Sequence, residues 1–365
     1  MTADNRRSLL FVLTSLRAGG TERQAAAIMN AVAADTTLRV SLLLLDGVSS
    51  DAYPISETIE RVPNPHGGVR GALLSAGWLW RQGHRFDRIV SFLDIANLLT
   101  AMTVPRERLV WNLRTAGTPA KPRSRLMFRA ARALSSTIPL AIANANAVRD
   151  FYVAEGFGCR AIDVLPNAVD TERFQPDEAL RQSARERLGI GGDQLLLGLI
   201  GRDHPVKRHD LAFAALARLP RAQLLCIGDR VSNAGRLREL ANQHGVSDRV
   251  RLLPPMATLE YLLPAVDIGL CVSDREGMPN SLLELMACGV PCIGTRVGGI
   301  PELLHEIGCV IEPGSTEALL SALETLSDAG LRTRMGTEAR QRIVADFSQA
   351  VVLHRWRQVL VPAAR

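Results

Sequence analysis

The sequence predicts an α/β protein with two Rossmann-like parallel-sheet domains. Its 365 residues suffice for two domains, and 47% hydrophobic with 22% charged residues is typical of a globular protein with a large core. Short apolar runs alternate with helical patterns along the chain, which indicates parallel sheets covered by helices. The alternation stops in a polar, charged segment at 170–193 and then restarts, so we expect one sheet on each side of it.

The predicted strands are short apolar runs that end in polar loops. They are 8–14, 39–45, 88–92, 108–113, 140–144 and 162–166 in the first half, and 195–201, 222–228, 249–253, 267–272 and 290–295 in the second. The run at 8–16 follows two arginines, as in a signal peptide, but it is short and lacks a small-residue cleavage site, so we predict a buried strand. Helical patterns lie between most strands, for example at 22–34, and the chain reads as helical from about 315 onward. We expect domains at 1–170 and 171–345, followed by a helical segment at 346–365.

The net charge of +6 belongs to the first half of the chain. Residues 1–170 hold 20 Lys or Arg against 14 Asp or Glu, whereas residues 171–365 hold 23 of each. Within 104–132 there are eight basic residues and one acidic residue, Glu107. Such a field favours an anionic partner, whether phosphate, nucleic acid or a membrane surface. A solvated arginine-rich surface without a partner is the open alternative.

The absence of several sequence motifs argues against several functional classes of protein. The six cysteines show no paired zinc spacing and four lie in apolar runs, which predicts core thiols in a reducing cytoplasm. Neither G-x-G-x-x-G nor G-x-x-x-x-G-K-[ST] occurs, which argues against nicotinamide enzymes and P-loop ATPases. No apolar run approaches the ~18 residues of a transmembrane helix.

Ligands of parallel sheets bind in the loops that follow the carboxyl ends of strands. The first such loop is SLRAGGTERQ (15–24), where Gly19 and Gly20 precede a helix with Glu22 in its first turn. In the structural alternative, Thr21 would cap a tight turn from strand to helix. Glycines let the backbone approach a ligand, and a helix start offers N–H groups to an anion. A tight turn without a ligand is the alternative.

The second loop is LIGRDHPVKRHDL (199–211). Arg202 and Lys207 flank its proline and form a pair suited to a diphosphate, since Arg offers a planar fork and Lys a point charge. Lys207 is one of only two lysines in the chain, which favours a specific use of its ammonium group. We predict His204 and His209 to be surface residues, because nothing completes a metal site. A solvated basic loop remains an alternative.

The third loop contains DREGMPNSLLE (274–284). A glycine and a proline prevent one continuous helix from Glu276 to Glu284, and Asn280 is a predicted N-cap. Carboxylates accept hydrogen bonds from sugar hydroxyls, and the N–H groups of the first helical turn form an anion site between them. VGGIPE (297–302) adds another Gly-Gly loop. The alternative has Glu284 only capping the helix and Glu276 in solvent.

These loops, in this order, resemble glycosyltransferase family 4, the retaining GT-B enzymes that use nucleotide-sugar donors. E-G-M-P-N-S-L-L-E resembles the family's E-x7-E signature, G-R-D-H-P-V-K its donor-phosphate loop, and R-A-G-G-T-E-R its N-terminal Gly-Gly loop. L-P-N-A-V-D-T-E-R-F (165–174) resembles the interdomain crossing, and F-S-Q-A…W-R-Q-V-L the terminal helix.

Three positions depart from the family pattern. Ala168 replaces the usual glycine of the crossing, and Arg208 replaces the glycine that often follows the lysine. The acceptor-side histidine has no match, and Arg114 in NLRTAG (112–117) occupies that loop. These departures bear on the acceptor site more than on the donor site.

The resemblance implies a GT-B fold, in which two Rossmann-like domains face each other across a cleft and the C-terminal helix returns to the N-terminal domain. The N-terminal domain would bind the acceptor and the second domain the donor. Glu276 would bind the donor sugar, Glu284 the ribose, and the helix start with Arg202 and Lys207 the diphosphate. The implied donor site comprises Gly201, Arg202, Lys207, Glu276, Gly277, Met278, Pro279, Asn280, Ser281, Leu282, Leu283 and Glu284, of which Arg202, Lys207 and Glu276 are the expected catalytic residues. The implied acceptor or phosphate loop comprises Gly19, Gly20, Thr21, Glu22 and Arg114.

The expected activity is hexosyl transfer from a nucleotide sugar, such as a UDP- or GDP-sugar, to a hydroxyl of a glycan, polysaccharide precursor or lipid-linked saccharide. We expect no metal and no cofactor, because protein cations can stabilise the leaving diphosphate. Retention of anomeric configuration is implied by the resemblance. The alternatives are a nucleotide-sugar epimerase or hydrolase on the same fold, and a non-catalytic nucleotide-sugar or nucleic-acid binding protein, although we expect no nucleic acid.

The segment KPRSRLMFRAARAL (121–134) mixes cations with large apolar residues. It fits a helix resting on an anionic membrane beside a lipid-linked acceptor. An ordinary amphipathic helix packed on the sheet fits equally well. We expect a cytoplasmic protein, and peripheral contact at the inner face of the cytoplasmic membrane is one of these two open alternatives.

Overall fold

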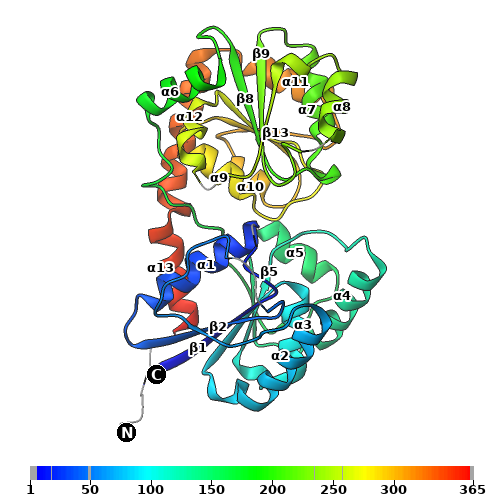
Figure 1. Cartoon of the computed structure of the whole chain (residues 1–365), viewed down its shortest axis with the longest axis vertical. Coiled ribbons are helices and arrows are strands. Elements are labelled where there is room, and N and C mark those ends of the chain that lie inside the picture. The colour runs from blue at the N-terminus through cyan, green and yellow to red at the C-terminus, as the bar shows by residue number, and fades with distance from the viewer. Residues whose placement is uncertain (1–5, 18, 48–50, 234, 257, 362–365) are drawn as a thin grey trace. The chain divides into compact units, whose positions relative to one another are not determined.

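The protein is divided into two compact units, each built on its own parallel sheet (Figure 1). The computed structural model describes residues 6–17, 19–47, 51–233, 235–256 and 258–361. Unit 1 consists of residues 1–167 and 352–365, and unit 2 of residues 168–351. Each unit is described below by itself.

Unit 1 contains a seven-stranded sheet in the order β3-β2-β1-β4-β5-β6-β7, with every pairing parallel. Its strands are β1 (Arg7–Leu13), β2 (Leu38–Leu44), β3 (Glu60–Arg61), β4 (Arg88–Phe92), β5 (Leu109–Leu113), β6 (Leu140–Ala143) and β7 (Ile162–Val164). Its helices are α1 (Gly20–Ala33), α2 (Gly68–Gln82), α3 (Leu93–Thr103), α4 (Pro122–Ser135) and α5 (Asn146–Ala154). Most of α13 (Gln349–Leu360) also belongs to this unit.

The strand order of unit 1 reverses after β3, which returns to β4 on the other side of β1. Because parallel crossovers are right-handed, this reversal places α1 on one face of the sheet and α2, α3 and α4 on the other. Figure 1 shows this arrangement, with α13 on the same face as α1. The side chain of Trp356 on α13 is 1% exposed, and Arg357 pairs with Asp35 at 3.0 Å.

Unit 2 contains a six-stranded parallel sheet in the order β10-β9-β8-β11-β12-β13. Its strands are β8 (Leu195–Ile200), β9 (Ala222–Ile227), β10 (Val250–Leu253), β11 (Ile268–Cys271), β12 (Cys292–Thr295) and β13 (Cys309–Ile311). Its helices are α6 (Glu178–Leu188), α7 (His209–Ala217), α8 (Gly235–Gln243), α9 (Asn280–Ala287), α10 (Ile300–Leu304), α11 (Thr316–Thr325) and α12 (Ala329–Arg342), the last continuing into a π-helical turn at Ile343–Phe347.

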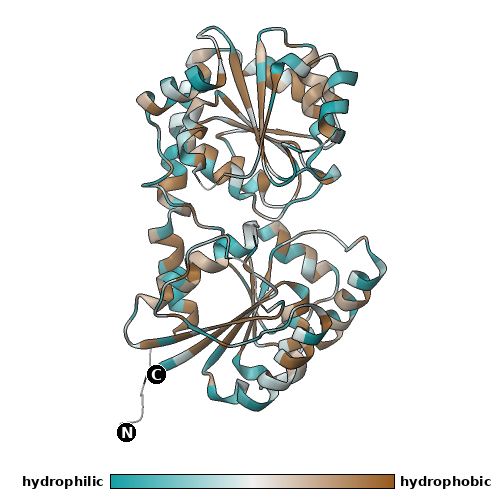
Figure 2. Cartoon of the chain, viewed as in Figure 1, coloured by the Kyte–Doolittle hydropathy of each residue, from teal (hydrophilic) through white to brown (hydrophobic). Residues whose placement is uncertain are grey.

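The sheets form the centres of both cores. Strand residues such as Phe11 and Trp111 in unit 1 and Leu224 and Ile268 in unit 2 are fully buried. Figure 2 shows the strands as almost continuously hydrophobic, as expected for sheets with both faces covered by helices. Four of the six cysteines are also buried, and burial raises the pKa of each of these four thiols. The prediction of core thiols is confirmed for these four.

All eleven predicted strands are confirmed within two residues at each end, including the strand at 8–14. The strands β3 and β13 were not predicted. Both are sheet edges of only two and three residues, too short for an apolar period to be read. The helical tail is confirmed, with breaks between α11 and α12 and at Ser348.

The two segments that join the units are hydrogen-bonded to each other. The N–H of Val169 donates to the carbonyl of Phe347, and the N–H of Gln349 donates to the carbonyl of Val169, both at 2.9 Å. This parallel bridge fixes the beginning of α13 relative to the first crossing. The boundaries of the units fall at 167/168 and 351/352, beside this bridge.

Candidate functional site

The switch point of the unit 2 sheet collects two of the three predicted loops. β8 and β11 are neighbours, but the chain leaves β8 toward β9 on one side and continues from β11 to β12 on the other. The loops after β8 and β11 therefore diverge at their carboxyl ends, where open α/β sheets bind ligands. These loops carry Lys207 and Glu276.

Lys207 and Glu276 form an ion pair between the two loops. Nζ of Lys207 lies 2.5 Å from Oε1 of Glu276, with side-chain exposures of 18% and 14%. Burial by itself lowers the pKa of Lys207, but the Glu276 carboxylate more than offsets this effect, and the pKa is raised above its usual value. Lys207 is therefore a fixed cation at this edge of the sheet. The thiol of Cys271 lies 3.8 Å from the same carboxylate oxygen.

Gly201 and Arg202 occupy the start of the β8 loop. A Cβ on Gly201 would lie 3.2 Å from Cε of Lys207, so this position leaves little room for a side chain beside the ammonium stem. The Arg202 side chain is exposed, whereas the side chain of Lys207, which ends in an ammonium group, is largely buried. The pair predicted to hold a diphosphate thus consists of one anchored and one solvent-facing cation.

Arg208 connects the same two loops. It has a left-handed backbone with φ of +51°, which explains why a glycine also suits this position. Its guanidinium pairs with Asp274 at 3.0 Å and Asp210 at 2.8 Å. The N–H of Asp274 also donates to the carbonyl of Val206 at 2.9 Å. In the sequence, Arg208 was notable only because it replaces a glycine of the family motif. In the structure, its ion pair with Asp274 connects it to the loop that carries Glu276.

The segment between the two glutamates is a loop followed by a helix start, as predicted. However, the prediction of Asn280 as the N-cap is wrong: Pro279 occupies the cap position and α9 begins at Asn280. A proline supplies the extended backbone of a cap, so no side-chain cap is required to start the helix. Ser281 follows Asn280 in the first turn.

The apolar residues of the predicted donor site point into the core. Met278, Leu282 and Leu283 are 6%, 0% and 1% exposed. Their side chains therefore anchor the loop and helix, and only their backbone remains to meet a ligand. A helix start offers N–H groups that lack intrahelical acceptors.

Glu284 is buried, with 3% exposure, one turn into α9. Arg173, which pairs with Glu260 at 2.7 Å, is also under the influence of Glu284, and both carboxylates raise the pKa of Arg173. The sequence did not single out Arg173, although it lies in the LPNAVDTERF segment. The two glutamates thus occupy different environments, Glu276 partly accessible and Glu284 enclosed.

A third loop, after β12, is in contact with the Glu276 loop. Gly298 has a φ of +53°, and a Cβ there would lie 2.1 Å from the carbonyl oxygen of Glu276. The N–H of Gly299 donates to the carbonyl of Gly277 at 2.6 Å. The Gly-Gly sequence is therefore required for two backbones to meet at this edge of the sheet.

Of the two histidines of the β8 loop that were predicted to be surface residues, only His209 contradicts the prediction. His209 is wrong as a surface residue: it is 1% exposed, and burial lowers its pKa to about 4. Neither ring nitrogen has a hydrogen-bond partner among the described residues. His209 lies on the face of α7 that packs against the sheet. Almost all residues of this short helix are apolar, so its sequence shows no clear periodicity from which that face could be predicted. His204 accepts a hydrogen bond from the N–H of Val206 at 3.2 Å.

In unit 1, the Gly-Gly loop follows β1 at the switch point between β1 and β4. Gly19 is the N-cap of α1, which begins at Gly20, so the cap at Thr21 that the tight-turn alternative assumed is wrong. Glu22 is confirmed in the first turn, and a Cβ on Gly19 would meet its carboxylate at 2.1 Å. Ala18 of this motif lies outside the described residues.

Tyr53 was not identified from the sequence, yet it holds this loop. Its hydroxyl donates to the carbonyl of Gly19 at 3.0 Å and accepts from the N–H of the same residue at 3.1 Å. No signal in the sequence connects a tyrosine 34 positions away with the glycine.

Arg114 is a buried cation at the end of β5. Nη1 donates to Oδ1 of Asn167 at 2.8 Å and Nη2 donates to Oδ1 of Asn112 at 3.0 Å. The guanidinium lies over the rings of Phe92 and Trp356, 5.3 and 5.8 Å from their centroids. Burial lowers its pKa to about 9. Arg114 thereby joins the last residue before the first crossing to the terminal helix.

Asp94 and Leu93 also lie at the switch point of unit 1, immediately after β4. Leu93 has a φ of +70°, an unfavourable backbone for a leucine, and strain of this kind is concentrated at functional sites. Burial raises the pKa of Asp94. The position of an aspartate directly after the predicted strand at 88–92 was the available signal, and the sequence reasoning did not use it.

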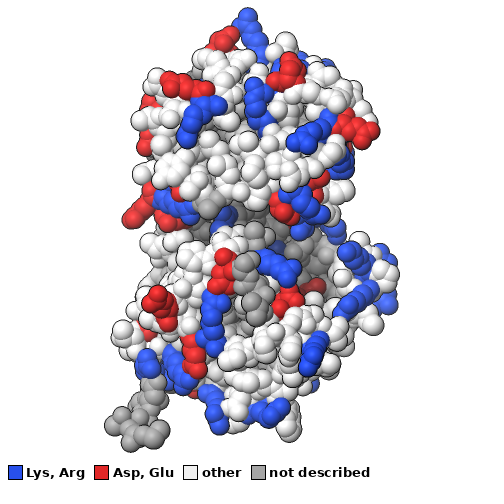
Figure 3. Space-filling view, viewed as in Figure 1, with Lys and Arg blue, Asp and Glu red and all other residues white. Residues whose placement is uncertain are grey.

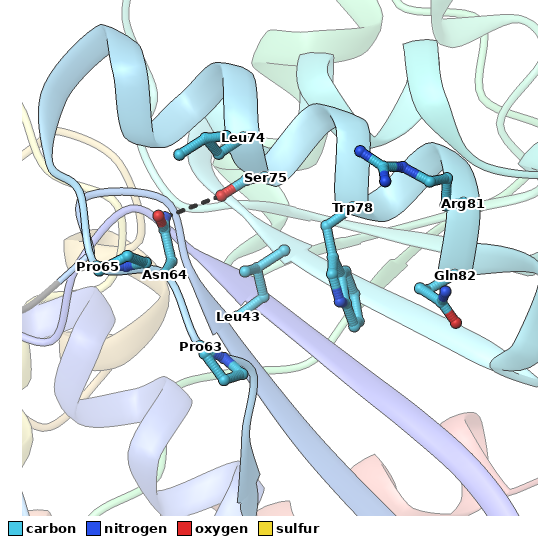
Figure 4. Close-up of a pocket in the computed structure, with 9 residues that line it drawn as sticks. All are labelled: Leu43, Pro63, Asn64, Pro65, Leu74, Ser75, Trp78, Arg81 and Gln82. Carbon is cyan, nitrogen blue, oxygen red and sulfur yellow. Dashed lines mark hydrogen bonds between the residues drawn. The ribbon is translucent and has the colours of Figure 1, made fainter.

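Two further features of the described residues concern metals and cavities. Within the described ranges, no three His, Cys, Asp or Glu side chains are grouped so that they could hold a metal ion. A pocket of about 270 Å³ lies in unit 1 between β2, residues 63–65 and α2 (Figure 4). None of its lining residues belongs to the predicted site.

Comparison with known proteins connects this geometry to a family. Residues 194–329, which contain both loops of the unit 2 switch point, match the family described as glycosyl transferases group 1. This part of the chain is therefore similar to group 1 glycosyltransferases. The family expected from the sequence is therefore confirmed, and the match covers Lys207, Glu276 and Glu284 together.

Curated relatives match over about half of the chain. An N-acetyl-alpha-D-glucosaminyl L-malate synthase of Bacillus anthracis is 34% identical over 210 residues, which are 56% of this chain and 54% of that protein. A D-inositol 3-phosphate glycosyltransferase of Mycobacterium marinum is 29% identical over 197 residues, 51% of this chain and 42% of that protein. The chain thus spans about half the length of these relatives or less.

Solved structures match over nearly the whole chain and show the fold. An Anabaena protein, Alr3699/HepE, solved in complex with UDP, has a TM-score of 0.80 at 20% identity, covering 97% of this chain and 99% of that one. A sucrose-phosphate synthase from Thermosynechococcus elongatus has a TM-score of 0.82 at 18% identity, covering 97% and 98%. The predicted GT-B class, with two Rossmann-like parallel-sheet domains, is confirmed.

Proposed function

We propose that the protein is a glycosyltransferase that moves a hexosyl group from a nucleoside-diphosphate sugar to an acceptor hydroxyl. One observation carries the proposal: Lys207 and Glu276 meet at 2.5 Å at the switch point of a group 1 glycosyltransferase domain, beside the start of α9. Fixed positive charge and a sugar-binding carboxylate are what transfer from such a donor requires.

In this proposal each part of the unit 2 site has one task. Lys207, Arg202 and the N–H groups at the start of α9 bind the diphosphate and stabilise its negative charge as it departs. Glu276 accepts hydrogen bonds from the sugar hydroxyls and holds Lys207 in place. Glu284 accepts hydrogen bonds from the ribose, for which its enclosed position is suited because a buried acceptor gains most from a specific donor.

We further propose transfer with retention, through front-face attack of the acceptor beside the departing phosphate. No metal and no cofactor take part in the proposed reaction, since Lys207 and Arg202 supply the positive charge. The reaction breaks the bond between the anomeric carbon and the diphosphate oxygen and forms one to the acceptor oxygen, and the acceptor proton leaves with the diphosphate.

Unit 1 supplies the acceptor side of the proposal. Its Gly19–Glu22 loop and the Asp94 position after β4 lie at the carboxyl edge where acceptors are expected to bind. The names of both curated relatives contain an anionic compound, L-malate in one and D-inositol 3-phosphate in the other. Together with the excess of arginine in residues 1–170, this favours an acceptor that carries a negative charge, in a glycan precursor or lipid-linked saccharide.

We also propose a cytoplasmic location with peripheral contact at an anionic membrane through 121–134. This segment forms α4, on which Leu126 is 69% exposed among exposed arginines, while Phe128 is buried. No helix in the described part of the chain has the length and apolar character needed to cross a bilayer.

The test is turnover over a panel of UDP- and GDP-sugars, with and without saccharide acceptors. The proposal expects one donor to be consumed, with transfer in the presence of acceptor, and a loss of about 10²–10³ in turnover in Glu276→Ala. Glu239→Ala, which removes an exposed glutamate of α8, is the matched control. Conversion of the donor to an epimer, or activity that survives Glu276→Ala, would contradict the proposal.

A further inference from the structure

The outer face of α2, α3 and α4 exposes more large apolar side chains than the rest of the described surface. Seven of the eleven exposed large hydrophobic residues in the described ranges lie on these three helices. Six of them define what we term the α2–α4 surface: Val69, Leu73 and Trp80 on α2, Ile95 and Met102 on α3, and Leu126 on α4. Their exposed fractions are 64%, 68%, 73%, 42%, 67% and 69%, in that order.

These residues form stripes rather than isolated positions. Val69, Leu73 and Trp80 recur at helical spacing along one side of α2, and Ile95 and Met102 do so on α3. α3 packs between α2 and α4 on a single face of the unit 1 sheet (Figure 1). The stripes therefore belong to one broad surface. Continuous exposed apolar areas of this kind mark interaction sites.

Packing against the core of unit 1 buries few of the large apolar side chains of α2. Among its large apolar side chains only Leu79 is fully buried. Beside Leu79, the helix rests on the pocket of about 270 Å³, which Leu74 and Trp78 line with Arg81 at its margin (Figure 4). The apolar residues on the outer side of α2 are therefore not needed for packing within unit 1. An outer apolar stripe of this kind is expected to be covered by a partner.

The charges around the α2–α4 surface are almost all positive. The three helices carry six arginines, Arg70, Arg81, Arg123, Arg125, Arg129 and Arg132, all of them exposed. Their single acidic residue is Asp94, which is not exposed. Figure 3 shows uncharged atoms bordered by blue side chains over α2 and α3.

Exposed apolar side chains beside the arginines of α2 and α4 match the interface of an anionic bilayer. Tryptophan prefers the headgroup level, leucine and methionine the acyl boundary, and each arginine near an anionic surface is attracted to the lipid headgroups. A second copy of the chain is a poorer partner, because a two-fold interface would place the same arginines of both copies against each other.

We propose that the α2–α4 surface inserts shallowly into anionic membranes, with Trp80, Leu73 and Met102 entering the interface. This deepens the membrane contact of the proposed function, which assigned it to α4 alone, and it assigns apolar insertion to α2 and α3. The inference does not depend on the transferase reaction, because vesicle binding and donor turnover are measured separately.

The experiment is co-sedimentation of the full chain with phosphatidylcholine vesicles and with vesicles that also contain phosphatidylglycerol. The variants are Leu73→Ser/Trp80→Ser, the charge reversal Arg125→Glu/Arg129→Glu, and Val344→Ser, which removes an exposed apolar residue of unit 2 as a matched control. Wild type is expected to bind only the anionic vesicles. The α2 double variant is expected to lose roughly tenfold or more in binding, the charge reversal to lose binding as well, and the control to bind like wild type.

Quenching by lipids with brominated acyl chains gives a second readout, which is measured first on the wild-type protein. Trp111 and Trp356 are buried, so quenching of wild-type fluorescence that disappears in Trp80→Phe assigns insertion to α2. Three outcomes would overturn the inference: equal binding by the α2 double variant, absence of quenching, or a concentration-dependent dimer, without lipid, that Leu73→Ser/Trp80→Ser abolishes. Loss of donor turnover in Glu276→Ala with unchanged vesicle binding would leave it intact.

Discussion

At the scale of single residues, the ion pair of Lys207 and Glu276 has both a structural and a proposed catalytic role. Both side chains are mostly buried, so removing one leaves the other charge without its partner. The pair also raises the pKa of Lys207 above its usual value, so the ammonium group is charged at neutral pH. A structural role and a binding role are separable by a double-mutant cycle.

The first prediction concerns this cycle. Lys207→Met is expected to lower the free energy of unfolding by about 1–3 kcal/mol, because the Glu276 carboxylate stays partly buried without its cation. Adding Glu276→Gln should restore part of that loss, yet leave donor turnover as low as in the single variant. Urea denaturation and initial rates measure the two quantities. If the double variant were less stable than the sum of both single effects predicts, the account of the pair would be wrong.

The second prediction concerns His209. Because burial holds its pKa near 4, the unfolded chain binds a proton that the folded chain does not between about pH 6.5 and pH 4. Stability is therefore complete above pH 6.5 and falls toward pH 4, by at most about 1.4 kcal/mol per pH unit from this group. His209→Leu, which has a similar volume, should flatten this part of the stability profile. An unchanged pH dependence in the variant would show that another group causes it.

At the scale of elements, the loops after β8, β11 and β12 depend on backbone approaches that a side chain would prevent. Gly298 lies against the carbonyl of Glu276, and Arg208 fastens Asp274 from a left-handed position. Through these contacts the three loops of the predicted donor site pack directly against one another. They also explain why the same short motifs contain both the binding residues and the glycines.

The third prediction follows from Gly298. Gly298→Ala should cost about 1–3 kcal/mol for its left-handed backbone, plus the displacement of the Glu276 loop, and should weaken nucleotide binding. Gly192→Ala is the matched control, because a Cβ there meets nothing within 4 Å. Calorimetric titration with UDP and GDP measures the binding. Equal affinity in Gly298→Ala and wild type would contradict the contact described here.

The elements themselves were largely predictable from sequence, and their details were not. Apolar runs identified eleven strands because both faces of each sheet are buried, whereas the edge strands β3 and β13 lack that signal. Propensity favoured Asn280 and Thr21 as caps, but the backbone uses Pro279 and Gly19 instead. Contacts between distant residues, such as that of Tyr53 with Gly19, leave no pattern in a single sequence.

At the scale of the whole molecule, the two units carry different charges and different predicted tasks. The excess of arginine and the α2–α4 surface belong to unit 1, while the segment that matches group 1 glycosyltransferases belongs to unit 2. Of these two features, only the one in unit 2 could be predicted from sequence motifs. The assignment of acceptor binding to unit 1 and donor binding to unit 2 stays a prediction.

The fourth prediction is thermodynamic. A nucleoside diphosphate that binds the folded unit 2 stabilises it by about 2.7 kcal/mol at a concentration 100 times its dissociation constant. Thermal unfolding followed by calorimetry should show an upward shift of the transition that includes unit 2. Glu284→Gln, at the predicted ribose contact, should reduce the shift, whereas the exposed-residue variant Glu239→Ala should not.

Hydrogen exchange in the presence and absence of UDP or GDP tests the central claim most directly. The account predicts increased protection of backbone amides at 201–208, 276–284 and 297–299, the loops at the unit 2 switch point, and loss of this protection in Lys207→Met. Protection that is absent with both nucleotides, or that appears only in segments outside these loops, would contradict the assignment of the donor site.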